Sequence, residues 1–473
     1  MGLVEQTAVR DSIRESWAAS VLPSLSELVE IPAVSQNFEP GWAERGQLHA
    51  AVHHVRRWLE TRAISGARVD VVELDGRSPL LLLDVPGDAD AGTALLYGHL
   101  DKQPPVGGWS EGLGPWTPVV RDGRLYGRGA ADDGYSGYAA TTAIEAVRAA
   151  GGSHSRCVVM LETGEESGSP DLPAYLEHLR PTLGEVSLVV CLDSGGNDYQ
   201  RLWLTTSLRG LVSVDLTVRV LESGQHSGLA SGVVPSSFRV IRQLLDRVED
   251  SRTGEILLPE MTVRVPEDRL AEVRASVAAA PGAVRSAFPM VRGARPVSDD
   301  EVELALNNSW RPTLSVIGAS GFPEPLDAGN VLRPFSTLTL SFRVPPTADS
   351  AAALAAVEKA LTVDVPYDAR VSLSRTESAD GWNAPTMAPW LSSALDTVSE
   401  SVFGASWRTV GLGGSIPFMG LLARQYPEAQ FVITGALGPD SNAHVPDEWL
   451  HLEHAQRVTE AVAHVLHAHA SSG

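Results

Sequence analysis

The sequence has few cysteines, and this scarcity limits the redox chemistry open to it. Only two occur among 473 residues, Cys157 and Cys191, and each lies inside an apolar run typical of a core strand. In such a setting, buried thiols are far more common than a disulfide or a reactive nucleophile. We therefore expect a protein of the reducing cytoplasm that does not depend on its cysteines for chemistry.

The sequence is also short of basic residues and of long apolar runs. It has 37 Lys and Arg residues against 58 Asp and Glu residues, so its formal net charge is −21. An acidic chain without a basic run repels phosphate backbones, which argues against a nucleic-acid partner. No apolar run reaches the roughly 18 residues that a membrane-spanning helix needs, so no membrane partner is expected. Residues 1–17 carry charges throughout and lack the apolar segment of a secretion signal.

Alternating strand and helix patterns occupy both ends of the chain. Apolar runs typical of buried parallel strands occur at 68–74, 79–85 and 93–101. A helical pattern follows at 133–150, and the same alternation returns after about residue 383. With 43% hydrophobic residues available for a core, this alternation predicts an α/β fold with a mostly parallel sheet.

The middle of the chain has a different pattern. Strands at 213–222 and 336–346 alternate apolar and polar residues, as half-exposed antiparallel strands do. With helices at 235–249 and 348–361, the order becomes strand, helix, strand, strand, helix, strand, which is typical of a ferredoxin-like α+β sandwich. The stretch 251–312 has no clear pattern and leaves room for extra helices.

These patterns predict two domains, one inserted into the other. A length of 473 residues is sufficient for two or three domains. We expect a discontinuous α/β domain formed by residues 1–208 and 383–473. Residues 209–382 are expected to form the inserted α+β domain.

Polar residues cluster in five segments that follow apolar strands or precede helices. The segments are GHLD (98–101), GRGAADDG (127–134), ETGEESGS (162–169), CLDSGG (191–196) and NAHVPDE (442–448). Ligands of parallel α/β sheets bind beyond the carboxyl ends of the strands. We therefore expect these segments to converge on one site.

The first two segments offer a histidine and a pair of carboxylates. His99 and Asp101 are two residues apart, so an extended chain places them on the same side. Asp101 is then placed to orient a metal-binding His99, although a surface pair at a turn is an equally common alternative. Asp132 and Asp133 could cap the following helix, but a carboxylate can also bridge two cations, and we assign that role to Asp132.

The other three segments add further carboxylates and a second histidine. Glu165 and Glu166 follow a strand, and hydrolysis at a metal needs both a ligand and a general base. The sequence does not decide which glutamate is which. Asp193 is a candidate terminal ligand, or the start of a glycine turn. His444 lies in a loop before the last helix.

Two histidines and several carboxylates together predict a metal centre. This donor set suits two borderline divalent ions, with zinc first and cobalt or manganese as alternatives. Each segment alone is a weak signal, because glutamate runs and Asp–Gly turns are usually solvated loops. The signal is stronger when all five occur in one acidic α/β chain.

The chain resembles the co-catalytic metallopeptidases that include carnosine dipeptidases, aminoacylases and glutamate carboxypeptidases. The resemblance is closest to the cytosolic non-specific dipeptidases. It rests on YGHLDKQP, LYGRGAADDG, ETGEESGS, LDSG, GQHSG, GGSIP and NAHVPDE, which match in order and spacing over residues 97–448. It implies a zinc-exopeptidase-like catalytic domain whose inserted domain is a lid that forms a homodimer.

The resemblance also implies the roles of the metal-site residues. Asp132 would bridge both ions, and His99 with Asp193 would complete one site. Glu166 and His444 would complete the other.

The remaining roles implied by the resemblance concern the proton, the support of the site and the substrate. Glu165 would be the general base, Asp101 would support His99, and the Asp132–Asp133 peptide would be cis. His226 of GQHSG would reach the substrate of the partner subunit and polarise the scissile carbonyl. The substrate carboxylate and backbone would be bound by Asn330, Arg343 and Ser415. The dipeptidases commonly have threonine where this chain has Asn330, which leaves that contact and the substrate range open.

These expectations define a hydrolase of small peptides. A water activated by two metal ions would attack the amide bond of a dipeptide or short peptide. An N-acyl amino-acid amidohydrolase or a carboxypeptidase is the first alternative, because both would use the same site. A catalytically silent binding protein is the alternative of another class, and the complete ligand set argues against it. A two-metal phosphoesterase is disfavoured because no basic cluster is present.

Overall fold

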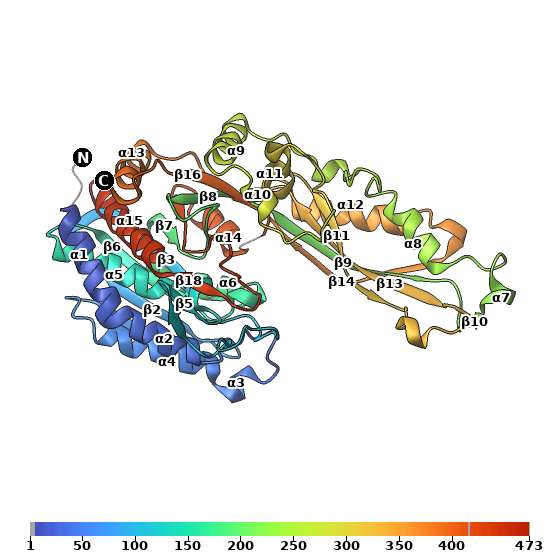
Figure 1. Cartoon of the computed structure of the whole chain (residues 1–473), viewed down its shortest axis with the longest axis horizontal. Helices are drawn as coiled ribbons and strands as arrows, with labels where there is room; N and C mark the ends of the chain where they lie inside the picture. The colour runs from blue at the N-terminus through green and yellow to red at the C-terminus, as the bar shows by residue number, and fades with distance from the viewer. Residues whose placement is uncertain (1–4, 415–416, 473) are drawn as a thin grey trace.

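The structure is a computed structural model that describes residues 5–414 and 417–472. Ser415, expected to bind substrate, lies outside the described residues. The molecule is elongated, with a thick α/β part at one end and a thin, flat α+β part at the other (Figure 1). The predicted α/β fold with a mostly parallel sheet and an inserted α+β element is confirmed.

The α/β part is built on a six-stranded sheet in the order β1-β2-β6-β3-β7-β17. Strands β6, β3, β7 and β17 are parallel, whereas β1 and β2 extend one edge in antiparallel pairing. The six strands are β1 (Arg68–Val72), β2 (Leu80–Val85), β3 (Ala89–His99), β6 (Ser155–Glu162), β7 (Val186–Cys191) and β17 (Gln430–Ile433). Both cysteines lie buried and unpaired on β6 and β7, as the sequence predicts.

Helices cover both faces of this sheet. Successive residues of a strand point to opposite faces, so Leu81 and Leu83 of β2 join one core while Leu80 and Leu82 join another. The first core includes α1 (Gln6–Ser16), α2 (Leu22–Glu30), α4 (Gln47–Glu60), α5 (Ser136–Ala149), α13 (Pro389–Val398) and α15 (Leu452–Ala470). The second core includes α6 (Leu172–Leu183) and α14 (Pro417–Gln425). This double covering explains why the sheet strands appear in the sequence as nearly continuous apolar runs.

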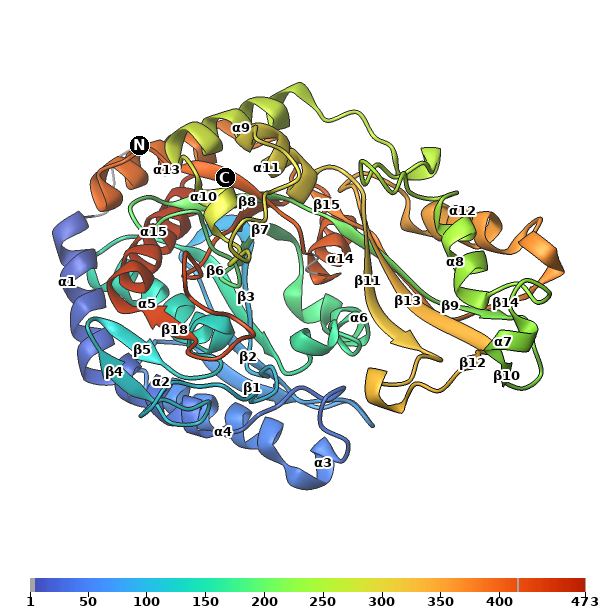
Figure 2. The same cartoon turned by 45° about the vertical axis from the view of Figure 1, so that its right-hand side comes forward.

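The α+β part, here called the lid, has a four-stranded antiparallel sheet in the order β11-β13-β9-β14. Its strands are β9 (Gly210–Arg219), β11 (Thr313–Ser320), β13 (Phe335–Val344) and β14 (Arg370–Ala379). Helices α8 (Ser237–Leu245) and α12 (Ser350–Thr362) pack on one face and bury apolar residues of β9 and β13. The tip, at the right of Figure 2, carries β10 (Gln225–His226), α7 (Ser227–Ala230) and β12 (Val331–Leu332).

A small three-stranded sheet lies where the lid meets the α/β part. Strand β8 (Trp203–Leu208) pairs in parallel with β16 (Arg408–Leu412) and antiparallel with β15 (Trp382–Asn383). The stretch 251–312, without a clear pattern in the sequence, holds α9 (Glu267–Ala279), α10 (Ala283–Ser286) and α11 (Glu301–Ser309). Helices α9 and α11 pack against β16. The domain boundaries at 208/209 and 382/383 stay a prediction.

The α/β part also contains shorter elements. They include α3 (Trp42–Arg45), β4 (Val119–Arg121), β5 (Arg124–Tyr126) and β18 (Trp449–His451). The last of these pairs with β5, which brings the segment after His444 beside the segment before Asp132. Among the described residues, no helix combines the length and the apolar character needed to cross a membrane.

Candidate metal centre

The five polar segments converge at the carboxyl ends of the central strands. His99 is the last residue of β3, and the turn with Glu165 and Glu166 follows β6. Asp193 comes two residues after β7. Parallel strands bring their carboxyl ends to one edge, which explains why residues so distant in the chain meet there.

Asp132 lies between the two histidines of the site. Nε2 of His99 is 3.4 Å from one carboxylate oxygen of Asp132, and Nε2 of His444 is 2.8 Å from the other. Around this centre, His99 Nε2 is 3.7 Å from Asp193 Oδ2, and His444 Nε2 is 3.4 Å from Glu166 Oε2. The structure therefore gathers all five expected metal ligands around one carboxylate.

The donor atoms fit a divalent cation. Two overlapping groups have ligand atoms within 4.8 Å of one another: His99 with Asp132 and Glu166, and His99 with Glu165 and Asp193. Nε2 of His99 is buried and has no hydrogen-bond partner among the described residues. A buried ring nitrogen that faces several carboxylates without a hydrogen bond is suited to a metal ion.

The charges of the site also favour a cation. Burial, together with repulsion from neighbouring carboxylates, raises the pKa of Glu165 and Glu166 above the usual range. The pKa of Asp193 rises to about 6 for the same reason. Burial also acts on Asp132, but the neighbouring rings of His444 and His99 outweigh it and lower the pKa of that carboxyl. Crowded, buried carboxylates are stabilised by a positive charge placed among them.

Asp101 supports the site in two ways. Nδ1 of His99 bonds to the main-chain oxygen of Asp101 at 3.0 Å. The Asp101 carboxylate lies 3.5 Å from the same ring nitrogen and accepts hydrogen bonds from the main-chain N–H groups of Glu165 and Glu166. Asp101 thus holds both the histidine ring and the turn that carries the two glutamates.

The Asp132–Asp133 peptide is cis, as the resemblance implies. Asp132 and Asp133 lie just before α5, which begins at Ser136, slightly later than the predicted start at 133. Oδ2 of Asp133 accepts a hydrogen bond from the main-chain N–H of His99 at 3.2 Å. This contact fixes the end of β3 against the turn that carries Asp132.

Two residues that hold the ligands in place were missed in the sequence. Gln103 Nε2 donates to Glu166 Oε2 at 2.6 Å, and the buried Glu448 accepts the main-chain N–H of Asp132 at 3.3 Å. Both lie inside motifs already singled out, GHLDKQP and NAHVPDE. A polar residue within a few positions of a ligand, in an otherwise irregular loop, is the signal that could have found them.

A cleft of about 930 Å³ opens beside the metal-site residues. The α/β part contributes Gln103, Asp132, Glu165, Glu166, Asp193 and His444 to its lining. The base of the lid contributes Leu211, Glu377, Ser378 and Ala379. The cleft therefore has room for a molecule larger than a single amino acid and touches both parts of the chain.

Comparisons with known proteins agree with this geometry. A model of peptidase family M20/M25/M40 matches residues 95–468. The chain belongs to peptidase family M20/M25/M40. This peptidase is 28% identical, over 80% of its length and 81% of the relative, to a cysteinylglycine-S-conjugate dipeptidase of Corynebacterium striatum.

Solved structures share the fold of this peptidase. The dipeptidase Dug1p of Saccharomyces cerevisiae superposes with a TM-score of 0.77 at 22% identity, over 100% of both chains. Human carnosine dipeptidase 1 gives a TM-score of 0.76 at 23% identity, over 98% of this chain and 99% of the other. The catalytic part and the lid thus both occur in known members of this fold.

The lid residues expected to bind substrate do not lie at the metal site of their own chain. His226 and Asn330 lie together at the lid tip, where the N–H of Ser227 donates to the main-chain oxygen of Asn330 at 2.8 Å. Both are exposed, and the tip lies at the far end of the peptidase from the central sheet (Figure 1). The His226 ring only accepts a hydrogen bond from the N–H of Gly228, at 3.1 Å.

Arg343 lies at the base of the lid instead. It is directly opposite Leu211 in the antiparallel pairing of β13 with β9. Opposite residues of such a pair point to the same face of a sheet. Leu211 and its other neighbour, Ala379, both line the cleft, so Arg343 is on the sheet face that borders it.

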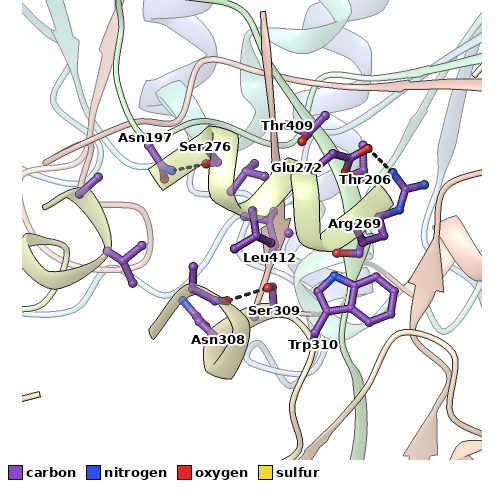
Figure 3. Close-up of a pocket in the computed structure, with 18 of the residues that line it drawn as sticks. Asn197, Thr206, Arg269, Glu272, Ser276, Asn308, Ser309, Trp310, Thr409 and Leu412 are labelled. Atoms are coloured by element: carbon purple, nitrogen blue, oxygen red, sulfur yellow. Dashed lines mark hydrogen bonds and ion pairs between the residues drawn. The ribbon is translucent and has the colours of Figure 1, made fainter. Parts of the chain in front are cut away.

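A second, smaller cavity of about 120 Å³ lies beside α9 and β16 (Figure 3). Helix α9 walls it with Arg269 and Glu272, which are ion-paired at 2.5 Å, and Glu272 also accepts a hydrogen bond from Thr206. Leu412 and Gly413 border both this cavity and the cleft. The cavity and the cleft are therefore adjacent at the end of β16.

Proposed function

We propose that this peptidase hydrolyses the amide bond of dipeptides and short peptides with the help of two divalent metal ions, zinc in the first place. The observation that carries the proposal is the arrangement of His99 and His444 on opposite oxygens of Asp132, with further carboxylates beside each histidine. Two ions that share one carboxylate fit this arrangement. Manganese or cobalt would suit the same donors.

Each ion would have its own set of protein ligands. His99 and Asp193 would hold one ion, Glu166 and His444 the other, and Asp132 would bind both. When bound, the ions supply a water molecule of lowered pKa and positive charge for the carbonyl oxygen of the substrate.

Glu165 is the proposed carrier of the proton. Its carboxylate lies 4.0 Å from His99 Nε2 and lines the cleft, so it can reach both the attacking water and the amide nitrogen. A raised pKa makes the Glu165 carboxylate a stronger base towards water, and the carboxylic acid that forms can then return the proton to the leaving amine. Glu165 would therefore act as base in the first step and as acid in the second.

Short substrates are favoured by the position proposed for Arg343. A guanidinium at the lid end of the cleft would pair with the terminal carboxylate of a peptide whose amide lies at the metal site. Only a short peptide ends at that distance from its scissile bond. Ser415 is proposed to assist Arg343 in binding this carboxylate.

His226 and Asn330 would act on the substrate of a second subunit. Their exposed position at the lid tip, away from the metal site of their own chain, supports this arrangement. Apolar side chains beside them, Leu229 at 81% and Val233 at 84% exposure, are unusual on a monomer and suit a contact with another copy. We therefore propose a homodimer formed through the lid.

The activities of the relatives support dipeptides as the substrate class. The matched proteins of Corynebacterium striatum, Saccharomyces cerevisiae and human are described as dipeptidases. We also propose a cytoplasmic location, because the two buried cysteines are unpaired, as is usual in a reducing compartment.

One assay tests this proposal against its rivals. The metal-loaded protein is incubated with libraries of dipeptides and N-acyl amino acids, and products are identified by mass spectrometry. We expect dipeptides to be cleaved fastest and a chelator to abolish cleavage. Preferential cleavage of N-acyl amino acids would favour the amidohydrolase, and binding of peptides without turnover would favour a silent binding protein.

A further inference from the structure

A buried ion pair joins the two loops that carry Asp132 and His444. Glu448 and Arg128 are both fully buried, and Glu448 Oε2 lies 2.7 Å from Arg128 Nη1. Arg128 belongs to the segment that leads to Asp132, and Glu448 belongs to the segment that follows His444. Buried charges are rare unless they are paired, so separating the two segments would leave an unpaired charge in the interior.

The second oxygen of Glu448 is fully used by the loop of Asp132. Oε1 accepts the main-chain N–H groups of Gly129 at 3.0 Å, Ala131 at 3.2 Å and Asp132 at 3.3 Å. One carboxylate thus fixes the backbone directly at the residue that lies between the two histidines. A carboxylate with this many hydrogen bonds from main-chain donors has little freedom to move.

Arg128 completes the connection on the other side. Its Nη2 donates to the main-chain oxygen of Val445, the residue after His444, at 3.1 Å. His444 has a positive φ of 65°, which non-glycine residues adopt only when their surroundings hold them. Between β17 and β18 the loop contains no helix or strand, so the contact with Arg128 adds to the few main-chain hydrogen bonds that hold it.

We propose that Glu448, through its ion pair with Arg128, is a positioning residue that fixes the separation of Asp132 and His444 and thereby the affinity of the metal site. The inference rests on the ligand set of the proposed function. Glu448 touches neither the cleft nor a donor atom of the ligands, so it acts only through the backbone of Asp132 and the loop of His444. Groups that orient metal ligands typically change metal affinity 10- to 100-fold.

The test is Glu448→Gln in the full chain, stripped of metal and titrated with Zn²⁺ against a competing chelator. Gln keeps the size of the side chain and an oxygen for the main-chain donors, but it removes the charge that faces Arg128. We expect Zn²⁺ to bind about 10- to 100-fold more weakly. We also expect the visible absorption bands of the Co²⁺-loaded protein to shift, because they report the geometry of the ligands.

Glu460→Gln is the matched control. Glu460 is also buried and ion-paired, with Arg10 at 3.0 Å, but it lies on α15 away from the ligands. Both variants lose the ion pair of a buried glutamate, so both should melt at a lower temperature, with the smaller decrease for Glu460→Gln because Arg10 is partly exposed. Only Glu448→Gln should change the Zn²⁺ affinity and the Co²⁺ spectrum.

A second variant covers the case in which Glu448→Gln does not fold. Arg128→Lys keeps the positive charge, but a single ammonium group cannot reproduce the two-nitrogen bridge from Glu448 to Val445. It should weaken Zn²⁺ binding in the same direction. An affinity within about threefold of the wild type and an unchanged spectrum, in whichever of the two variants folds, would overturn the inference.

The outcome is separable from that of the proposed function. If the wild type binds two ions but cleaves no peptide, the proposed function fails, and weaker binding by Glu448→Gln still supports the positioning role. If the wild type cleaves dipeptides and Glu448→Gln binds Zn²⁺ as tightly, only the positioning role fails.

Discussion

The metal-site end and the lid tip carry the two halves of one expected site, but they are built in opposite ways. His99 is fully buried at the end of β3, and its neighbours are held by Asp101, Asp133, Gln103 and Glu448. His226 is exposed on a two-residue strand and contacts little besides its own loop. The first half is pre-formed within one chain, whereas the second has few contacts of its own and would, in the proposed dimer, gain them from a second subunit.

This difference teaches which contacts each half depends on. The buried half depends on hydrogen bonds whose loss leaves charges without partners in the interior. Under the proposed function the exposed half would depend on assembly, since His226 at the tip lies far from the metal site of its own chain. The two halves therefore need different tests: kinetics and stability of single variants for the buried half, and mixing of variants for the exposed half.

The largest effect is expected in the buried half. Glu165→Ala should lower kcat for a dipeptide by about 10³- to 10⁴-fold while the metal content is retained, because a proton carrier is lost but the proposed ligands remain. Metal analysis and steady-state kinetics measure the two quantities. Glu177→Ala, on the exposed face of α6, is the control. Turnover near the wild-type rate would remove Glu165 from the mechanism.

A somewhat smaller effect is expected in the exposed half. His226→Ala should lower kcat by about 10²- to 10³-fold, because one hydrogen-bond donor to the carbonyl oxygen is lost. The melting temperature of this variant should change little, since the exposed side chain makes one hydrogen bond, from the N–H of Gly228, in its own chain.

Mixing the two inactive variants tests whether the halves come from different subunits. A mixed dimer of Glu165→Ala and His226→Ala has one complete site, so random reassociation should restore about a quarter of the wild-type activity. No recovery, with dimers shown by light scattering, would mean that His226 does not act across the interface.

A fall in pH should destabilise the α/β part of the molecule more than the lid. Burial lowers the pKa of His454, His464 and His469 of α15 to about 4, whereas the lid core described in the structure has no histidine. These histidines fold in their neutral form, so their contribution is complete above their ordinary pKa near 6.5 and is lost as the pH falls towards 4. Protonation of each histidine should lower the free energy of unfolding by about 1 to 3 kcal/mol over that range.

His464→Leu is the variant that checks this acid sensitivity. Neither ring nitrogen of His464 has a hydrogen-bond partner among the described residues, so an apolar replacement leaves no polar group unpaired. Melting temperatures between about pH 7 and pH 4.5 should fall less steeply in this variant than in the wild type. Equal slopes would show that another group controls acid unfolding.

The smallest effect is expected from Asn330. Asn330→Ala should raise KM for a dipeptide by about 2- to 10-fold with little change in kcat, which corresponds to one hydrogen bond to the substrate. The matched change Asn330→Thr should alter the order of preferred dipeptides more than the rate. A large fall in kcat would instead assign Asn330 to the chemical step.

The sequence was most informative where a buried strand is followed directly by candidate site residues. The runs before His99, Glu165 and Asp193 are buried on both faces, so they stood out as apolar segments followed by polar residues. The division into two parts was also visible, because the lid strands alternate apolar and polar residues while the central strands are almost continuously apolar. The positions of these metal-site residues therefore followed from local patterns.

Other parts depended on contacts between distant segments. Strand β8, WLTTSL, is entirely buried despite three hydroxyl residues, and its partner β16 lies some 200 residues later. Helices α9 and α11 have little amphipathic contrast, because polar residues such as Arg269, Ser276 and Ser309 are among their buried positions. Glu448 could not be identified from the sequence either, since its role depends on an ion pair with Arg128, which lies 320 residues earlier in the chain.

The order of the central sheet has a consequence for synthesis of the chain. Strand β17, which covers the outer edge of β7, is made about 240 residues after it. At roughly 5–20 residues per second, the ribosome leaves that apolar edge open for about 10–50 s while the whole lid is translated. An open edge strand is a site of wrong pairing. The nascent protein therefore needs protection during translation, and His444 can join the other ligands only after almost everything else has emerged.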